Sequence, residues 1–220
     1  MITAVIPARG GSKGLPRKNV RRLSGKPLIT RCVATCLEVC DRVIVSTDDA
    51  EIATLAEAAG AEVIERPDEL ATDTATSWEV VRHAIGAADI TGTLAMVQCT
   101  APFLHADDIL GCAELIGTHD LATTVLPTHQ LLVNAWGSAI NWSTSQTLRQ
   151  QRPTQYRLTG SCWAFATCHA WQDQYSGRIG IHLARHPYQI DIDTLADLEL
   201  CQATALPGRV GPEMRLVTRP

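Results

Sequence analysis

Residues 2–19 read ITAVIPARGGSKGLPRKN, an apolar run that passes directly into a loop of glycines and basic residues. The run Ile2–Pro7 is short and rich in β-branched residues, which predicts a buried strand. In open α/β sheets, ligands bind beyond the carboxyl ends of the strands. The loop after this first strand is therefore the predicted binding site of the protein.

The first half of the chain alternates between strand and helix patterns. Such alternation predicts an α/β fold with a mostly parallel, Rossmann-like sheet. Asp48 or Asp49 is expected to cap the second helix, which ends at Gly60. The predicted strands are Ile2–Pro7, Arg42–Ser46, Ala61–Ile64 and Leu94–Gln98, and the predicted helices are Pro27–Val39, Asp49–Ala59, Thr76–Ile85 and Ala106–Ile116.

The pattern changes after Pro127. Residues 128–156 are polar, with weak alternation around Leu131–Ile140, and are interpreted as an inserted arm that makes a dimer contact through residues 128–148. Residues 1–220 are interpreted as a single domain whose tail, 207–220, is poorly ordered. Strand alternation returns at Ser161–Ala166 and Ile179–Leu183, and a last helix is expected at Leu195–Ala205.

The composition is that of an ordinary globular domain. The 220 residues carry a net charge of −4, and this argues against a nucleic-acid-binding surface. No apolar stretch approaches the ~20 residues that span a bilayer, and the N-terminus does not have the pattern of a signal peptide. Eight cysteines lie mostly in apolar, periodic segments without a CxxC pair, so core packing in a reducing cytoplasm is expected.

The glycine-rich loop has the chemistry of a phosphate site. Gly10 and Gly11 allow backbone N–H groups to point at an anion, and Arg9 and Lys13 supply positive charge. The Asn19 amide could reach a phosphate or a sugar. The segment lacks both GxxxxGK[ST] and a GxGxxG that opens a helix, which disfavours a P-loop or a dinucleotide site. A solvated basic turn is the alternative reading.

An acidic pair near the C-terminus has the pattern of a metal site. Asp191 and Asp193 alternate with Ile190 and Ile192, so on an extended segment both carboxylates project to one side. Two carboxylates on one face favour a hard cation such as Mg2+. The alternative is that Asp193 caps the last helix.

The loop 6–19 resembles the nucleotide-binding loop of CMP-N-acetylneuraminate (acylneuraminate) cytidylyltransferases, the CMP-sialic acid synthetases. Five further stretches match this family in order, and the likeness covers residues 2–203. They are VSTDDAEIA, ERPDELATDTATS, QCTAP, LRQQRPTQYRLTG and QIDIDTLADLELC.

The resemblance implies a reaction in which CMP passes from CTP to the anomeric hydroxyl of an acidic α-keto sugar, with Mg2+ as cofactor and a homodimer as the assembly. Arg9, Lys13, Asp191 and Asp193 would be catalytic, and the last two would bind the metal. Nucleotide binding would fall to Arg9, Gly10, Gly11, Ser12, Lys13, Asn19, Arg66, Ala75 and Ser77, and sugar binding to Gln98, Arg149, Gln150, Arg157 and Thr159.

The sequence departs from the family pattern on the sugar side. Cys99 stands where proline is common, Ala101 where serine is common, and Thr159 where asparagine is frequent. A KDO-like or specialised acceptor and a non-catalytic CTP-binding homologue therefore remain alternatives. A glycosyltransferase, which also uses an Asp pair, is a third, and it would not release pyrophosphate.

Overall fold

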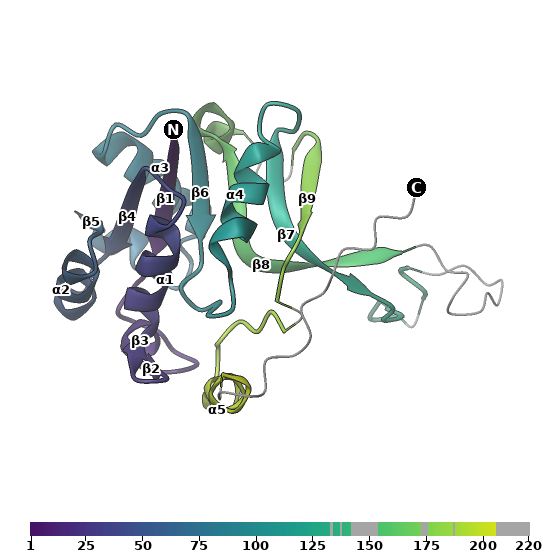
Figure 1. The fold of residues 1–220 in the computed structure, drawn as a ribbon, viewed down its shortest axis with the longest axis horizontal. Helices are drawn as coiled ribbons and strands as arrows, with labels where there is room; N and C mark the ends of the chain where they lie inside the picture. The colour runs from purple at the N-terminus through teal and green to yellow at the C-terminus, as the bar shows by residue number, and fades with distance from the viewer. Residues whose placement is uncertain (133, 137, 142–153, 173–175, 187, 206–220) are drawn as a thin grey trace.

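The computed structural model describes residues 1–132, 134–136, 138–141, 154–172, 176–186 and 188–205. Its main sheet has the strand order β5-β4-β1-β6-β8-β7-β9 (Figure 1). Only β8 runs antiparallel to its neighbours, which confirms the mostly parallel α/β sheet. The strands are β1 Ile2–Pro7, β4 Arg42–Thr47, β5 Glu62–Glu65, β6 Thr93–Val97, β7 Leu121–Thr128, β8 Gln155–Ala166 and β9 Ile179–Leu183.

Helices cover both faces of the sheet because alternate strand residues point to opposite sides. Ile6 of β1 is buried against α1, α2 and α4, whereas Val5 is buried on the other face against α3. A short ribbon, β2 Arg22–Leu23 with β3 Lys26–Pro27, lies near α5 at the end of the molecule toward which β1 runs (Figure 1). The helices are α1 Leu28–Leu37, α2 Ala50–Ala58, α3 Ser77–Ala87, α4 Ala106–Glu114 and α5 Leu195–Thr204.

Side-chain caps fix where the helices begin. Asp49 caps α2 by accepting the N–H groups of Glu51 and Ile52, each at 3.0 Å, as the sequence predicted. The last helix is capped by Thr194, which forms a capping box with Asp197. The alternative that Asp193 is this cap is therefore wrong.

The structure extends the strand prediction in the second half of the chain. The sequence analysis missed β7 because six successive residues from Leu121 to Leu126 are buried, so no alternation marks the strand. It found only the last six residues of β8, since the first half is largely exposed. Strands β7 and β8 extend past the end of β9 as a two-stranded ribbon (Figure 1), which leads into the segment that was predicted to be an arm. Residues 142–153 of that arm and the tail 206–220 lie outside the described part of the chain.

Within the described residues, no helix has both the length and the apolar character needed to cross a bilayer.

The contact between Phe165 and Trp78 tests the packing of α3 on the sheet. Phe165 is fully buried, and the two ring centroids are 4.5 Å apart. Because Phe165→Ala leaves a cavity, we expect it to lower the free energy of unfolding by about 3–5 kcal/mol in urea titrations. Trp171→Ala, at a 65% exposed position, is the control and should change it by less than about 0.5 kcal/mol. Equal effects would contradict the assigned core.

Candidate functional site

A cavity of about 860 Å³ opens beyond the carboxyl ends of β1 and β6. It is lined by the loop after β1, the segment before α3, the end of β6, part of β8, and the segment before α5. The chain thus brings residues from five distant segments to one place. Ten of the predicted site residues line this cavity, namely Arg9, Ser12, Lys13, Asn19, Arg66, Ala75, Ser77, Gln98, Asp191 and Asp193.

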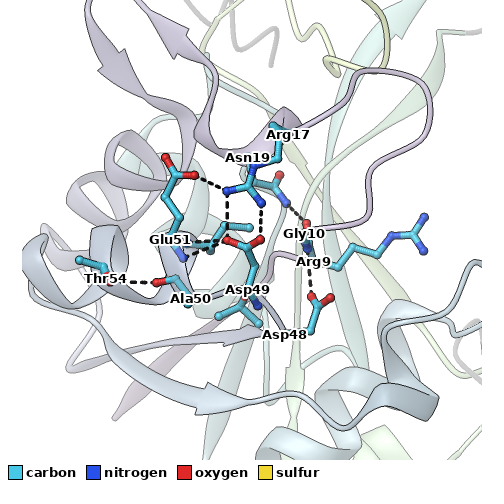
Figure 2. A network of polar contacts seen from close by, with 11 residues as sticks. Arg9, Gly10, Arg17, Asn19, Asp48, Asp49, Ala50, Glu51 and Thr54 are labelled. Carbon is cyan, nitrogen blue, oxygen red and sulfur yellow. Dashed lines mark hydrogen bonds and ion pairs between the residues drawn. The ribbon is translucent and has the colours of Figure 1, made fainter.

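Carboxylates after β4 hold the glycine-rich loop in place (Figure 2). The Asp48 carboxylate accepts the Gly10 N–H at 2.9 Å. The Arg17 guanidinium, on a residue with left-handed φ of 59°, pairs with Asp49 and Glu51. This pairing is the main reason that the pKa of Asp49 lies below its usual value. The loop is therefore anchored to the N-terminus of α2.

A second contact joins the loop to the acidic pair. A Cβ on Gly14 would lie 2.6 Å from the backbone oxygen of Asp193, so the close approach requires glycine. Nearby, the Lys18 ammonium is 2.7 Å from Asp193 Oδ1. Lys18 lines the cavity, although the sequence analysis did not select it. Its signal was its place in the basic run directly before Asn19.

Arg9 and Lys13 converge on one carboxylate across the cavity. The Arg9 guanidinium is 2.9 Å from Asp73 Oδ1, and the Lys13 ammonium pairs with the other oxygen. Lys13 first, and then Arg9, hold the pKa of the Asp73 carboxyl below its ordinary value. A negatively charged group thus already binds between the two cations that were predicted to bind phosphates. Asp73, which is 42% exposed, was not predicted from the sequence.

Arg66 is a buried residue in the wall of the cavity. It is 5% exposed, and its guanidinium donates to the Ser46 carbonyl oxygen at 2.7 Å. Burial lowers its pKa. The Gln98 backbone N–H donates to the Ser161 oxygen at 3.0 Å, which fixes the end of β6 beside β8. The two side chains therefore come from rigid parts of the fold.

Asn19 lies within the loop's own hydrogen-bond network. Its side chain is 5% exposed, and Nδ2 donates to the backbone oxygen of Arg9 at 2.9 Å. The amide oxygen accepts a hydrogen bond from the Cys99 thiol at 2.9 Å. The structure therefore gives Asn19 a bracing position in addition to its place in the cavity wall.

The acidic pair has the arrangement that the alternation predicted. Ile192 is fully buried and its N–H donates to the Thr100 oxygen at 2.8 Å, whereas Asp191 and Asp193 are exposed. Both carboxylates line the cavity. Because Thr194 caps α5, the Asp193 carboxylate is not engaged as a helix cap. Two exposed carboxylates beside a basic loop have the hard oxygen donors that suit Mg2+.

Several predicted residues lie elsewhere. Gly10 and Gly11 do not line the cavity, and the N–H groups of Gly10 and Ser12 donate to Asp48 and to the Gly10 carbonyl oxygen. Arg157 lines a separate cavity of about 510 Å³. The Thr159 hydroxyl bonds to Thr124 across the β7–β8 ribbon. The predictions for Arg149 and Gln150 fall outside the described residues.

The sequence of the chain is similar to that of a known protein family. A family model described as "Cytidylyltransferase" matches residues 3–204. The chain is 31% identical to N-acylneuraminate cytidylyltransferase B of Danio rerio over 92% of its length, and 51% identical to CMP-N,N'-diacetyllegionaminic acid synthase of Legionella pneumophila over 52%. The matched parts cover 51% and 52% of these relatives, so the chain spans about half their length.

The fold is also found among solved structures. A CMP:2-keto-3-deoxy-manno-octonic acid synthetase complexed with CTP aligns with a TM-score of 0.69 at 19% identity. The alignment covers 92% of this chain and 97% of that one. At this identity the likeness establishes the fold.

Asp73 provides a test of the anion site that needs no substrate turnover. Asp73→Asn removes the carboxylate that competes for Arg9 and Lys13, so we expect pyrophosphate to bind a few-fold more tightly at low salt. Isothermal titration calorimetry measures this affinity. Asp68→Asn, an exposed position with the same charge change, is the control and should have little effect. Weaker pyrophosphate binding in Asp73→Asn would show that Asp73 supports the anion site.

Proposed function

Because the chain belongs to the cytidylyltransferase family, we propose that it transfers CMP from CTP to the anomeric hydroxyl of an acidic α-keto sugar. The observation that carries the proposal is the single cavity in which Arg9, Lys13 and Lys18 face Asp191 and Asp193. The three basic side chains suit a bound triphosphate, and the two carboxylates suit the metal cation that accompanies it.

The transfer needs positioning and charge neutralisation more than covalent help from the protein. The sugar oxygen forms a bond to the α-phosphorus as the bond to pyrophosphate breaks, and the hydroxyl proton is released. Arg9 and Lys13 would exchange Asp73 for the β- and γ-phosphates and hold them as they leave. The Lys18 ammonium, which lies beside Asp193, could approach the reacting phosphate from the side of the acidic pair.

Asp191 and Asp193 are the residues that would hold Mg2+. When bound, the ion would neutralise phosphate oxygens and stabilise the charge that develops in transfer. The Lys18 ammonium already occupies one oxygen of Asp193, which supports a position of high negative potential there. Burial of Ile192 between the two carboxylates would keep both directed into the cavity.

For the acceptor we propose a nonulosonic acid of the sialic or legionaminic type. The relatives named for N-acylneuraminate and for N,N'-diacetyllegionaminic acid support this class of acid. Gln98 follows β6 and Trp163 lies on β8, and both line the cavity, where a sugar could contact them. Arg157, which lies in the neighbouring cavity, would reach the acid only from outside the main site.

Pyrophosphate release tests the reaction and the metal assignment together. With CTP and Mg2+, we expect release with one acid from a panel of N-acetylneuraminate, a legionaminate and KDO. Asp193→Ala should lower turnover by at least about a hundredfold because it removes a carboxylate ligand of the ion. Glu199→Ala, an exposed carboxylate on α5, is the matched control and should retain turnover. Near-normal turnover of Asp193→Ala at saturating Mg2+ would contradict the metal site.

We further propose a homodimer through residues 128–148. Apolar side chains in the described part of this segment are exposed, including Trp136 at 87%, Ile140 at 61% and Leu132 at 47%. Exposed apolar groups gathered in one segment favour a protein contact. Sedimentation velocity at micromolar concentration should give a dimer, and Trp136→Asp should shift it toward monomer. A monomeric wild-type protein would contradict the proposal.

A reducing cytoplasmic location is also proposed. All eight cysteines are free thiols, and six of them are buried. Buried free thiols of this kind suit a compartment in which disulfides do not persist.

A further inference from the structure

Cys99 has no role in the transfer described above, yet its side chain contacts the nucleotide loop. The residue follows Gln98 in the turn after β6 and is 3% exposed. Its thiol donates to Asn19 Oδ1 at 2.9 Å, and Asn19 Nδ2 donates to the Arg9 backbone oxygen at 2.9 Å. We propose that Cys99 is a positioning residue for CTP, because it fixes the Asn19 amide that holds Arg9. This inference rests on the proposed function.

An asparagine amide has two similar orientations, and its partners decide between them. The Arg9 carbonyl accepts only, so it requires the amide nitrogen, and the thiol then meets the amide oxygen. Rotation of the amide by a half-turn would bring two oxygens together and place the nitrogen against the thiol. Because Asn19 is buried, these lost hydrogen bonds would not be replaced by water.

The thiol keeps its proton in this setting. Burial is the main cause that raises the pKa of Cys99 well above its ordinary value, and the Asp191 carboxylate raises it further, against the opposing effect of Lys18. A protonated thiol remains a donor across the neutral pH range. The raised pKa therefore keeps Cys99 able to donate to Asn19 at neutral pH.

The hydrogen bonds from Cys99 to Asn19 and from Asn19 to Arg9 connect the turn after β6 with the glycine-rich loop. Arg9 begins the glycine-rich loop, whereas Cys99 lies next to Gln98 in the turn after β6. Gly10 donates to Asp48 in the segment before α2, and Gly14 lies close to the Asp193 backbone oxygen. Asn19 supplies the contact of the loop with the turn after β6. Without that contact, the Arg9 backbone would be less restricted, and its guanidinium would meet the triphosphate less often in the correct position.

Substitutions at Cys99 separate the hydrogen bond from packing. Cys99→Ala removes the thiol, Cys99→Val replaces it with a slightly larger apolar side chain without a donor, and Cys99→Ser keeps a donor. We expect the Ala and Val variants to bind CTP about three- to tenfold more weakly by calorimetry, and Cys99→Ser to stay near wild type. The Michaelis constant for the acid should not change. Cys112→Ala, a fully buried thiol in the same core cluster, is the control and should leave CTP binding unchanged.

A double-mutant cycle with Asn19→Ala tests whether Cys99 acts through Asn19. In the Asn19→Ala background, Cys99→Val should have no further effect on CTP affinity. Melting temperatures of all variants show whether a loss of affinity reflects unfolding, and Cys99→Ser and Cys99→Val are compared under conditions in which both are folded.

The possible results separate the inference from the proposed function. CTP binding that is equal in wild type, Cys99→Ala and Cys99→Val would overturn the inference and leave the proposed function intact. Additive effects in the cycle would also overturn it. Absence of CTP binding by the wild-type protein would overturn the proposed function and the inference together.

Discussion

Mutual repulsion among the cations of the glycine-rich loop is the constraint on which the site depends. Four basic side chains occur between positions 9 and 18, and each is compensated by a carboxylate from another element. Asp49 and Glu51 follow β4, Asp73 follows β5, and Asp193 precedes α5. The order of strands in the sheet brings these carboxylates to the loop. The fold therefore organises a cationic site by surrounding it with carboxylates. A polyanion could replace Asp73 at Arg9 and Lys13, and a metal ion could replace Lys18 at Asp193.

Much of the parallel half could be predicted from the sequence, because its signals are local. Strand β1 is short and apolar, and Asp49 caps α2 through its own neighbours in the chain. The second half lacks such signals. Thr123 and Thr124 have polar side chains, yet both are buried in β7, and the direction of β8 depends on partners far away in the sequence. Burial on both faces hides the alternation that identifies a strand.

The candidate site was predictable where its functional residues lie close together in the sequence. Arg9 and Lys13 share one loop, and Asp191 and Asp193 share one alternating segment, so their proximity follows from the chain itself. Asp73 was not predictable in this way, since its partner Arg9 is 64 positions away, as the residue numbers give (73 − 9 = 64). The role of Cys99 is similar, because the sequence shows a departure from a pattern but not the amide that it contacts.

Strand β8 has a consequence for how the exposed end of the sheet can vary. Its 12 residues join the exposed ribbon to the cavity wall at Gly160 and Trp163, and its pairing with β7 changes register between Thr123 and Val125. In a continuous ladder, an insertion of one residue would exchange the inward and outward side chains along its length. The irregularity divides the ladder, so a length change in the outer part can be absorbed before it reaches the cavity. The outer ribbon can therefore change in length without changing which side chains of β8 face the cavity.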